Sequence, residues 1–267
     1  MMKRLFILLL PLLLLTGCTQ YAKVQKSMDY SYKYELSKVY FMEGEYSQAS
    51  SLLESVLAFT KGTTQAEEAL YMLSMCYYEM GDNVTASSYL TTYFNTYPRG
   101  VYAEKARFMS AKALYRDTPD PRLDQTSTIK AIGEIQVFLE YYPYSKYSDE
   151  AYRMLYELHD RLVEKEYRSA LLYYDLGNYM GNNYLSCIIT AQNALNDYPY
   201  TKLREELSML ILRARFGMAK ESVQDKMMDR YRDTEDEYYA FRNEFPDSKY
   251  MKEADKILRE TEKVLKK

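Results

Sequence analysis

The chain has 267 residues, with 31 tyrosines and 15 methionines but no tryptophan, one histidine, nine glycines and seven prolines. So few turn-forming residues argue against a β-sandwich or β-barrel, which needs a turn about every 8–12 residues. The single histidine, His159, leaves no His-rich metal site and no histidine-dependent nucleophilic catalysis elsewhere in the chain. A net charge of −3 argues against nucleic-acid binding, because phosphates are bound by clustered cations.

The first 18 residues are typical of a bacterial secretory leader. Lys3 and Arg4 precede an apolar run of 11 residues, Leu5 to Leu15, whereas a membrane-spanning helix needs about 20. The segment Leu15-Thr16-Gly17-Cys18 resembles a lipobox, which implies cleavage before Cys18 and attachment of a diacylglycerol thioether and an N-acyl chain to that residue. An ordinary signal peptide with an incidental cysteine is the alternative.

A lipidated Cys18 predicts a protein that is anchored to a membrane without spanning it, because several acyl chains together hold firmly. Thr19 is not the aspartate that commonly retains lipoproteins at the inner membrane, so the outer membrane is the expected destination. Residues 18–27 would form the tether. Removal of residues 1–17 takes away two cations and no acid, which moves the net charge from −3 to −5.

Helix breaks recur along the chain as an aromatic residue followed by proline, which cannot continue a helix. The breaks are Tyr97-Pro98, Tyr142-Pro143, Tyr198-Pro199 and Phe245-Pro246. A finer pattern repeats at an offset of 37 residues: Leu36, Tyr40, Gly44, Glu45, Tyr46, Ala49, Leu53 and Val56 correspond to Leu73, Tyr77, Gly81, Asp82, Asn83, Ala86, Leu90 and Tyr93. This pattern resembles the tetratricopeptide repeat (TPR), a pair of antiparallel helices.

Two kinds of position in that pattern have a clear physical reason. Gly44 and Gly81 fall at the turn between the two helices, where glycine adopts a positive φ at little cost. Ala49 and Ala86 are small where the paired helices approach most closely. The sequence therefore predicts helix pairs that stack along the chain.

Later elements follow the same scheme with a looser register. We expect helices over about 102–115 and 129–141, separated by a loop containing Pro119 and Pro121. Neither glycine nor proline occurs between Pro143 and Gly177, which predicts a helix over 148–176 of about 43 Å at 1.5 Å per residue. After a turn at 178–183, a helix is expected over about 184–197. A helix over 203–220 would then pair with a second helix that ends at Phe245, and a last helix over about 250–267 would form a terminal cap.

The predicted fold is an all-α, TPR-like right-handed solenoid of about five helix pairs, with a long protruding helix in the fourth unit. Such a stack presents a concave surface rather than a catalytic pocket. The first two repeats would line it with eight residues, which suit an extended peptide: Tyr34, Lys38, Phe41, Met42, Tyr71, Met75, Tyr78 and Glu79. The same residues could instead fill the core between repeats.

No residue pattern predicts catalysis, a metal or a cofactor. The carboxylate pairs Glu67/Glu68 and Glu205/Glu206 lie at helix starts, where acids are favoured in any case. His159 is expected on the surface or at a partner contact. Cys76 and Cys187 could form a disulfide in an oxidising compartment, but buried small residues are the favoured interpretation.

Together, the lipobox and about five helix pairs resemble the BamD (YfiO) family of outer-membrane lipoproteins, over about residues 28–245. The segments that carry the resemblance are Pro119–Pro121 with Leu123–Gln125, Ala131, Phe138, Tyr142–Tyr147, Asp149–Ala151, Asp160–Leu162, Glu166-Tyr167, Tyr173-Tyr174 and Asp197–Pro199. The resemblance implies a non-catalytic subunit of the β-barrel assembly machinery. Its C-terminal repeats would dock a POTRA domain of a BamA-like barrel protein, and its N-terminal groove would receive unfolded outer-membrane protein segments.

The expected organisation is therefore a signal peptide at 1–17, a lipidated tether at 18–27, substrate-binding repeats at 28–141, and BamA-docking repeats with a capping helix at 142–267. The main alternative is a periplasmic TPR adaptor lipoprotein for cell-wall or envelope-constriction proteins. A glycan-capturing lipoprotein is disfavoured, because sugar sites favour tryptophan platforms and the chain has none.

Overall fold

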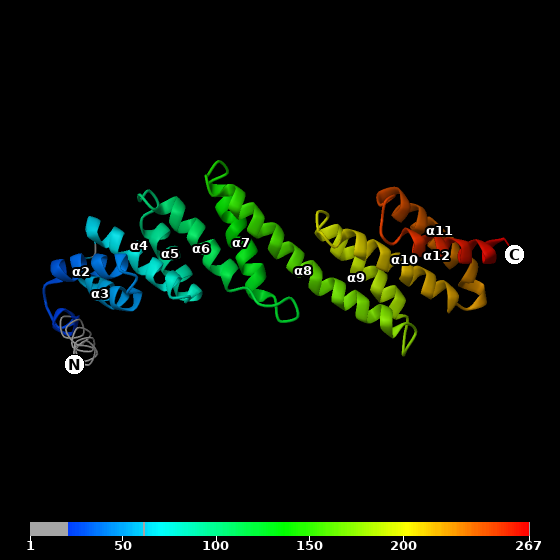
Figure 1. Ribbon diagram of the computed structural model, residues 1–267, viewed down its shortest axis with the longest axis horizontal. Helices are drawn as coiled ribbons and strands as arrows, with labels where there is room; N and C mark the ends of the chain where they lie inside the picture. The colour runs from blue at the N-terminus through cyan, green and yellow to red at the C-terminus, as the bar shows by residue number, and fades with distance from the viewer. Residues whose placement is uncertain (1–20, 61, 267) are drawn as a thin grey trace, which may run out of the picture. The chain divides into compact units, whose positions relative to one another are not determined.

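The computed structural model describes residues 21–60 and 62–266, and in these residues every regular element is a helix (Figure 1). The helices are α2 (Tyr30–Met42), α3 (Tyr46–Phe59), α4 (Thr64–Glu79), α5 (Asn83–Thr96), α6 (Ala103–Arg116), α7 (Thr126–Tyr141), α8 (Ser148–Leu176), α9 (Asn183–Asp197), α10 (Arg204–Lys220), α11 (Gln224–Glu244) and α12 (Met251–Leu265). The predicted all-α, TPR-like solenoid is confirmed.

Two compact units make up the chain. Unit 1 comprises the residues up to Thr118 together with 127–154, and unit 2 comprises 119–126 together with the residues from Leu155 onward. The first two turns of α8 thus belong to unit 1 and the rest of this helix to unit 2. The sequence places its own boundary earlier, between residues 141 and 142.

In unit 1, successive helices from α2 to α6 pack against one another. One core cluster joins α2, α3 and α4 and consists of Tyr34, Ala49, Leu53, Val56, Ala69, Met72, Leu73 and Cys76. The two turns that the repeat predicts are alike: Gly44 and Gly81 have φ of 80° and 82°. Ala49 and Ala86 are fully buried, as their small size at the helix contact predicts.

Residues 21–27 show that part of the expected tether is folded. Residues 21–25 are helical, Val24 is buried, and the ring of Tyr21 contacts that of Tyr40 edge-on with centroids 5.9 Å apart. This stretch therefore packs on the first helix pair. Cys18 and the leader lie outside the described residues.

In unit 2, α9 packs on α10, α10 on α11, and α12 on both α10 and α11. One core cluster centres on Val163, Cys187, Leu207 and Leu210, and a second on Met209, Tyr238 and Phe241. Helix α8 is 29 residues long and has the predicted bounds. Helix α12 buries one face through Ala254, Ile257 and Thr261, which agrees with the expected terminal cap.

Candidate functional site

A cluster of stacked tyrosines lies in unit 1. The ring of Tyr71 stacks on that of Tyr102, with centroids 4.3 Å apart and planes 10° from parallel, and contacts Tyr93 edge-on at 5.8 Å. The ammonium of Lys105 lies 5.5 Å from the centre of the Tyr71 ring, a cation–π contact. Because Tyr71 and Tyr93 are buried, these contacts fix the rings within the packing between repeats.

A carboxylate fixes one hydroxyl of this cluster, that of Tyr93. The Tyr93 hydroxyl donates to Glu67 at 2.6 Å and accepts the backbone N–H of Tyr102 at 3.1 Å. Glu67 also accepts the N–H of Val101 at 3.0 Å. Burial first, and then the bond to Glu67, raise the pKa of Tyr93. The hydroxyl is therefore protonated at neutral pH and acts as a structural donor.

The same chemistry joins other helix pairs of unit 1. Tyr34 on α2 donates to Glu68 on α4, and Tyr77 on α4 donates to Glu54 on α3. The pKa of Tyr34 is raised chiefly by burial, and that of Tyr77 chiefly by its bond to Glu54. Both acids lie on a helix that neighbours the tyrosine, so each bond fixes the packing of two helices.

The structure separates the eight groove candidates by exposure. Tyr34, Tyr71 and Tyr78 are buried, and the Arg116 guanidinium lies 4.5 Å from the centre of the Tyr78 ring. The partly exposed candidates are Lys38, Phe41 and Met75, and the exposed ones are Met42 and Glu79. The buried tyrosines belong to the packing between repeats in the structure as it stands, and five candidates keep surface available.

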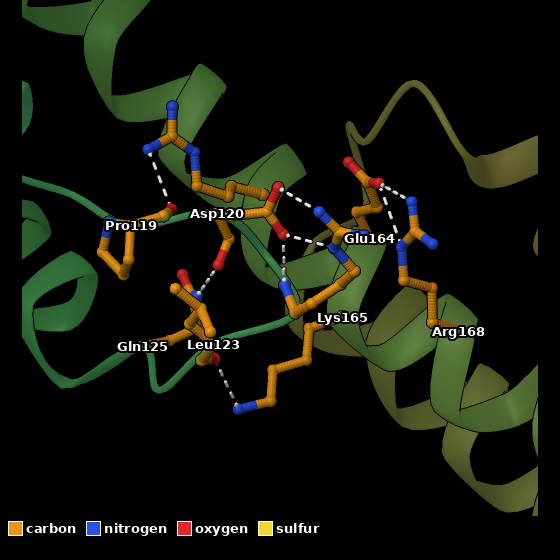
Figure 2. A network of polar contacts seen from close by, with 9 residues as sticks. Pro119, Asp120, Leu123, Gln125, Glu164, Lys165 and Arg168 are labelled. Atoms are coloured by element: carbon orange, nitrogen blue, oxygen red, sulfur yellow. Dashed lines mark hydrogen bonds and ion pairs between the residues drawn. The ribbon is translucent and has the colours of Figure 1, made fainter.

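Figure 2 shows a polar network in unit 2 that sequence reasoning missed, formed by the loop 119–126 and α8. Within the loop, the Asp120 carboxylate accepts the Arg122 backbone N–H at 2.9 Å, and Nε and Nη2 of the same arginine at 2.9 and 3.2 Å. These bonds lower the pKa of Asp120 to about 2. The Gln125 amide donates to the carbonyls of Asp120 and Leu123 at 2.9 and 3.1 Å, which closes the loop.

Helix α8 holds this loop through its cations. Arg161 Nη1 donates to the Pro119 carbonyl and Lys165 Nζ to the Leu123 carbonyl, each at 3.4 Å (Figure 2). The two residues are four apart, so they project from one face of the helix. The loop residues and α8 are separated by about 42 positions in sequence, and no local pattern indicates that they meet.

The remaining chemistry-bearing residues have structural environments. Cys76 and Cys187 are buried free thiols, and burial raises the pKa of each to about 12. His159 is half-buried, and its ring lies 5.1 Å from that of Tyr198. Among residues 21–60 and 62–266, no three His, Cys, Asp or Glu side chains are grouped to hold a metal ion. Within the same residues, no helix combines the length and apolarity needed to cross a bilayer.

Comparison with known proteins identifies the family. A family model described as "YfiO: Outer membrane lipoprotein" matches residues 26–227. A protein of Aquifex aeolicus (strain VF5) named "Putative outer membrane protein assembly factor BamD" is 29% identical over 126 residues. That alignment covers 46% of this chain and 41% of the relative, so it spans less than half of either protein. The family match extends over most of both compact units, and the chain belongs to the YfiO family of outer membrane lipoproteins.

Proposed function

We propose that the protein is a non-catalytic lipoprotein subunit of the outer-membrane β-barrel assembly machinery, which scaffolds a BamA-like barrel protein on its periplasmic side and helps to insert β-barrel proteins. The observation that carries the proposal is the family match across residues 26–227. The printed name of the Aquifex aeolicus relative, an assembly factor, supports the same role.

The environments of the reactive groups support a non-catalytic role. A nucleophilic thiol or phenol needs a lowered pKa, whereas burial raises the pKa of both Cys76 and Cys187 to about 12. The tyrosines that contact carboxylates are held protonated as donors. Side chains of this kind fix helices and present contact area, which is what a scaffold requires.

The anchor is part of the proposal. Cys18 would carry the acyl chains and hold the protein on the periplasmic face of the outer membrane. Residues 21–25 pack on the first helix pair, so the lipid would be joined to the fold by a short segment. Replacement of Cys18 by Ala should release the protein from membranes or leave its leader uncleaved.

The N-terminal and C-terminal repeats would bind different partners. Repeats within 28–141 would receive unfolded outer-membrane protein segments at the candidates that keep exposed surface, among which Met42 is 77% exposed. Repeats within 142–267 would dock a POTRA domain of the barrel protein. A groove of about 420 Å³ in unit 2, lined by residues of α9, α10 and α11 that include Gln192, Asn193 and Ser208, offers hydrogen-bonding groups for such a contact.

Purification of the affinity-tagged full-length protein from membranes in mild detergent tests the proposal. We expect co-purification of a large barrel protein with periplasmic POTRA domains. Recovery of only cell-wall enzymes or envelope-constriction proteins would overturn the proposal and favour the adaptor alternative. The Cys18→Ala variant is the control, because it shows whether recovery of the barrel protein depends on the lipid anchor.

A further inference from the structure

A cavity of about 270 Å³ in unit 2 lies where α8 passes the turn between α9 and α10. Tyr156 and His159 on α8, with Tyr198 and Tyr200 in the turn, supply aromatic walls. Asp160 and Asp197 also line the cavity, whereas none of its described lining residues is a lysine or arginine. Ring faces and carboxylates both attract cations.

The turn that forms one wall is held in place by hydrogen bonds. Asp160 accepts the Thr201 hydroxyl at 2.9 Å and the Lys202 backbone N–H at 3.1 Å. The Thr201 hydroxyl in turn accepts the N–H of Leu203 at 3.2 Å, and the Thr201 N–H donates to the Tyr198 carbonyl at 3.1 Å. Because the residues on both sides are fixed, the backbone position of Tyr200 is set before any ligand binds.

Two of the aromatic residues that line the cavity are exposed and can contact a ligand. The rings of His159 and Tyr198 lie 5.1 Å apart at 50° and form the less exposed wall. Tyr200 is 85% exposed and Tyr156 is 51% exposed. A group that enters the cavity can therefore cover two tyrosine rings that the fold leaves in contact with water.

The charges around the cavity favour a cation. Asp160 already forms an ion pair with Lys202, at 3.3 Å, but no such pair is seen for Asp197 in the part of the chain that the structure describes. Asp197 is the last residue of α9, so the negative end of the helix dipole adds to its charge. Burial lowers the pKa of His159, with Asp160 opposing the shift, and the imidazole is uncharged at neutral pH.

We propose that this cavity binds the lysine or arginine side chain of a partner protein, with its aliphatic stem and charged group against the tyrosine rings and its charge beside Asp197. Both side chains carry an apolar stem below a cation, which matches an apolar cavity with an acidic edge. The inference rests on the proposed function for the existence of a protein partner. Its chemistry, however, can be tested on the protein alone.

His159 makes a direct test possible because it is the single histidine of the chain. Its ring gives one distinct imidazole NMR signal in the full-length, untagged protein, and the ring forms part of the cavity wall. N-acetyl-arginine methylamide would be titrated at pH 7, with the citrulline analogue as a neutral control of nearly the same shape and the leucine analogue as an apolar control. We expect a saturable shift of the His159 signal with the arginine compound only.

Three variants locate the binding site. We expect Asp197→Asn and Tyr200→Ala each to weaken binding about threefold, the size expected for one exposed ion pair or one cation–π contact. Tyr179→Ala is the matched control, because Tyr179 lies in the α8–α9 turn of the same unit and is also exposed. This control should bind the arginine compound like the unmodified protein. Because both tyrosines are exposed, neither substitution is expected to unfold the protein, so weaker binding by Tyr200→Ala would reflect the loss of its ring.

Two outcomes would overturn the inference. The first is no shift with the arginine compound, and the second is an equal shift with the citrulline or leucine compound, which would mean that charge is not recognised. Neither outcome bears on the recovery of a barrel protein from membranes. Failure of the cavity proposal is therefore distinguishable from failure of the proposed function.

Discussion

The two units of the molecule use the same helix-pair architecture with a different balance of side-chain chemistry. In the described residues of unit 1, tyrosine rings stack and their hydroxyls donate to carboxylates on neighbouring helices, as with Tyr93 and Glu67. In unit 2, arginines on α10 form ion pairs with carboxylates on α12 and α11, as Arg213 does with Glu253 and Arg215 with Glu237. A tyrosine–carboxylate bond also occurs there, from Tyr238 to Asp255. The difference indicates that helix stacking sets the fold, whereas the bonds between helices can be aromatic or ionic.

Core truncation should have the largest effect and should be alike in both units. Leu73 and Leu207 are fully buried, in the cores of units 1 and 2 respectively. We expect Leu73→Ala and Leu207→Ala each to lower the free energy of unfolding by about 3 kcal/mol. Hydrogen exchange should accelerate in the unit that carries the change, and Val101→Ala, at an exposed site, should have little effect. Equal acceleration of hydrogen exchange in both units would contradict the division of the chain into two compact units.

The ion pair of Arg215 with Glu237 is the next strongest test, because both side chains are about one-fifth exposed. Arg215→Ala leaves a largely buried carboxylate without its partner, and we expect a loss of about 2 kcal/mol, which is less than for a fully buried pair. Burial already raises the pKa of Glu237 despite the arginine. The double variant Arg215→Ala/Glu237→Gln should recover part of the loss in urea unfolding, and no recovery would argue against an electrostatic cause.

The hydroxyl of Tyr93 tests the aromatic chemistry of unit 1. Tyr93→Phe keeps the ring but removes the bonds to Glu67 and from the Tyr102 N–H, and we expect a loss of about 1–2 kcal/mol. Its pKa in the folded protein is raised above the ordinary tyrosine value of 10.0. The stabilisation is thus complete below pH 10 and declines as the pH rises through the folded pKa. Tyr144→Phe, at a fully exposed site, is the control.

The pair of Glu253 with Arg213 should give the smallest effect and the opposite pH dependence. The hydrogen bonds from Arg213 lower the pKa of Glu253 below the ordinary glutamate value of 4.5. Its contribution is therefore present above pH 4.5 and is lost as the pH falls through the folded pKa. Because Glu253 is nearly half exposed, we expect Glu253→Gln to cost less than about 1 kcal/mol at pH 7. The cost should shrink in acid, and a cost independent of pH would contradict this assignment.

Local patterns predicted much of the fold correctly. The absence of glycine and proline between Pro143 and Gly177 gives the bounds of α8, and the repeated Gly44 and Gly81 adopt the positive φ that their turns require. These features depend on residues close together in the chain. The same reasoning could not separate core from groove at Tyr71, because its burial depends on Tyr93 and Tyr102 in later elements.

The features that the sequence did not predict depend on contacts between residues far apart in the chain. Lys165 holds the Leu123 carbonyl across 42 positions, and Asp160 holds the α9–α10 turn across a similar separation. The residues that carry the family resemblance, such as Asp160 and Arg161, thus include structural anchors. The cavity beside Asp197 arises from the same long-range packing, and no spacing in the sequence indicates it.

Chemical cross-linking in intact membranes, followed by mass spectrometry, is the most direct test of the proposed role in β-barrel assembly. We expect cross-links between lysines of residues 142–267, such as Lys202, and a periplasmic domain of a barrel-forming outer-membrane protein. Lys202 is 85% exposed at its side chain and so is accessible to the reagent. Cross-links from this segment only to cell-wall enzymes or envelope-constriction proteins would contradict a role in β-barrel assembly.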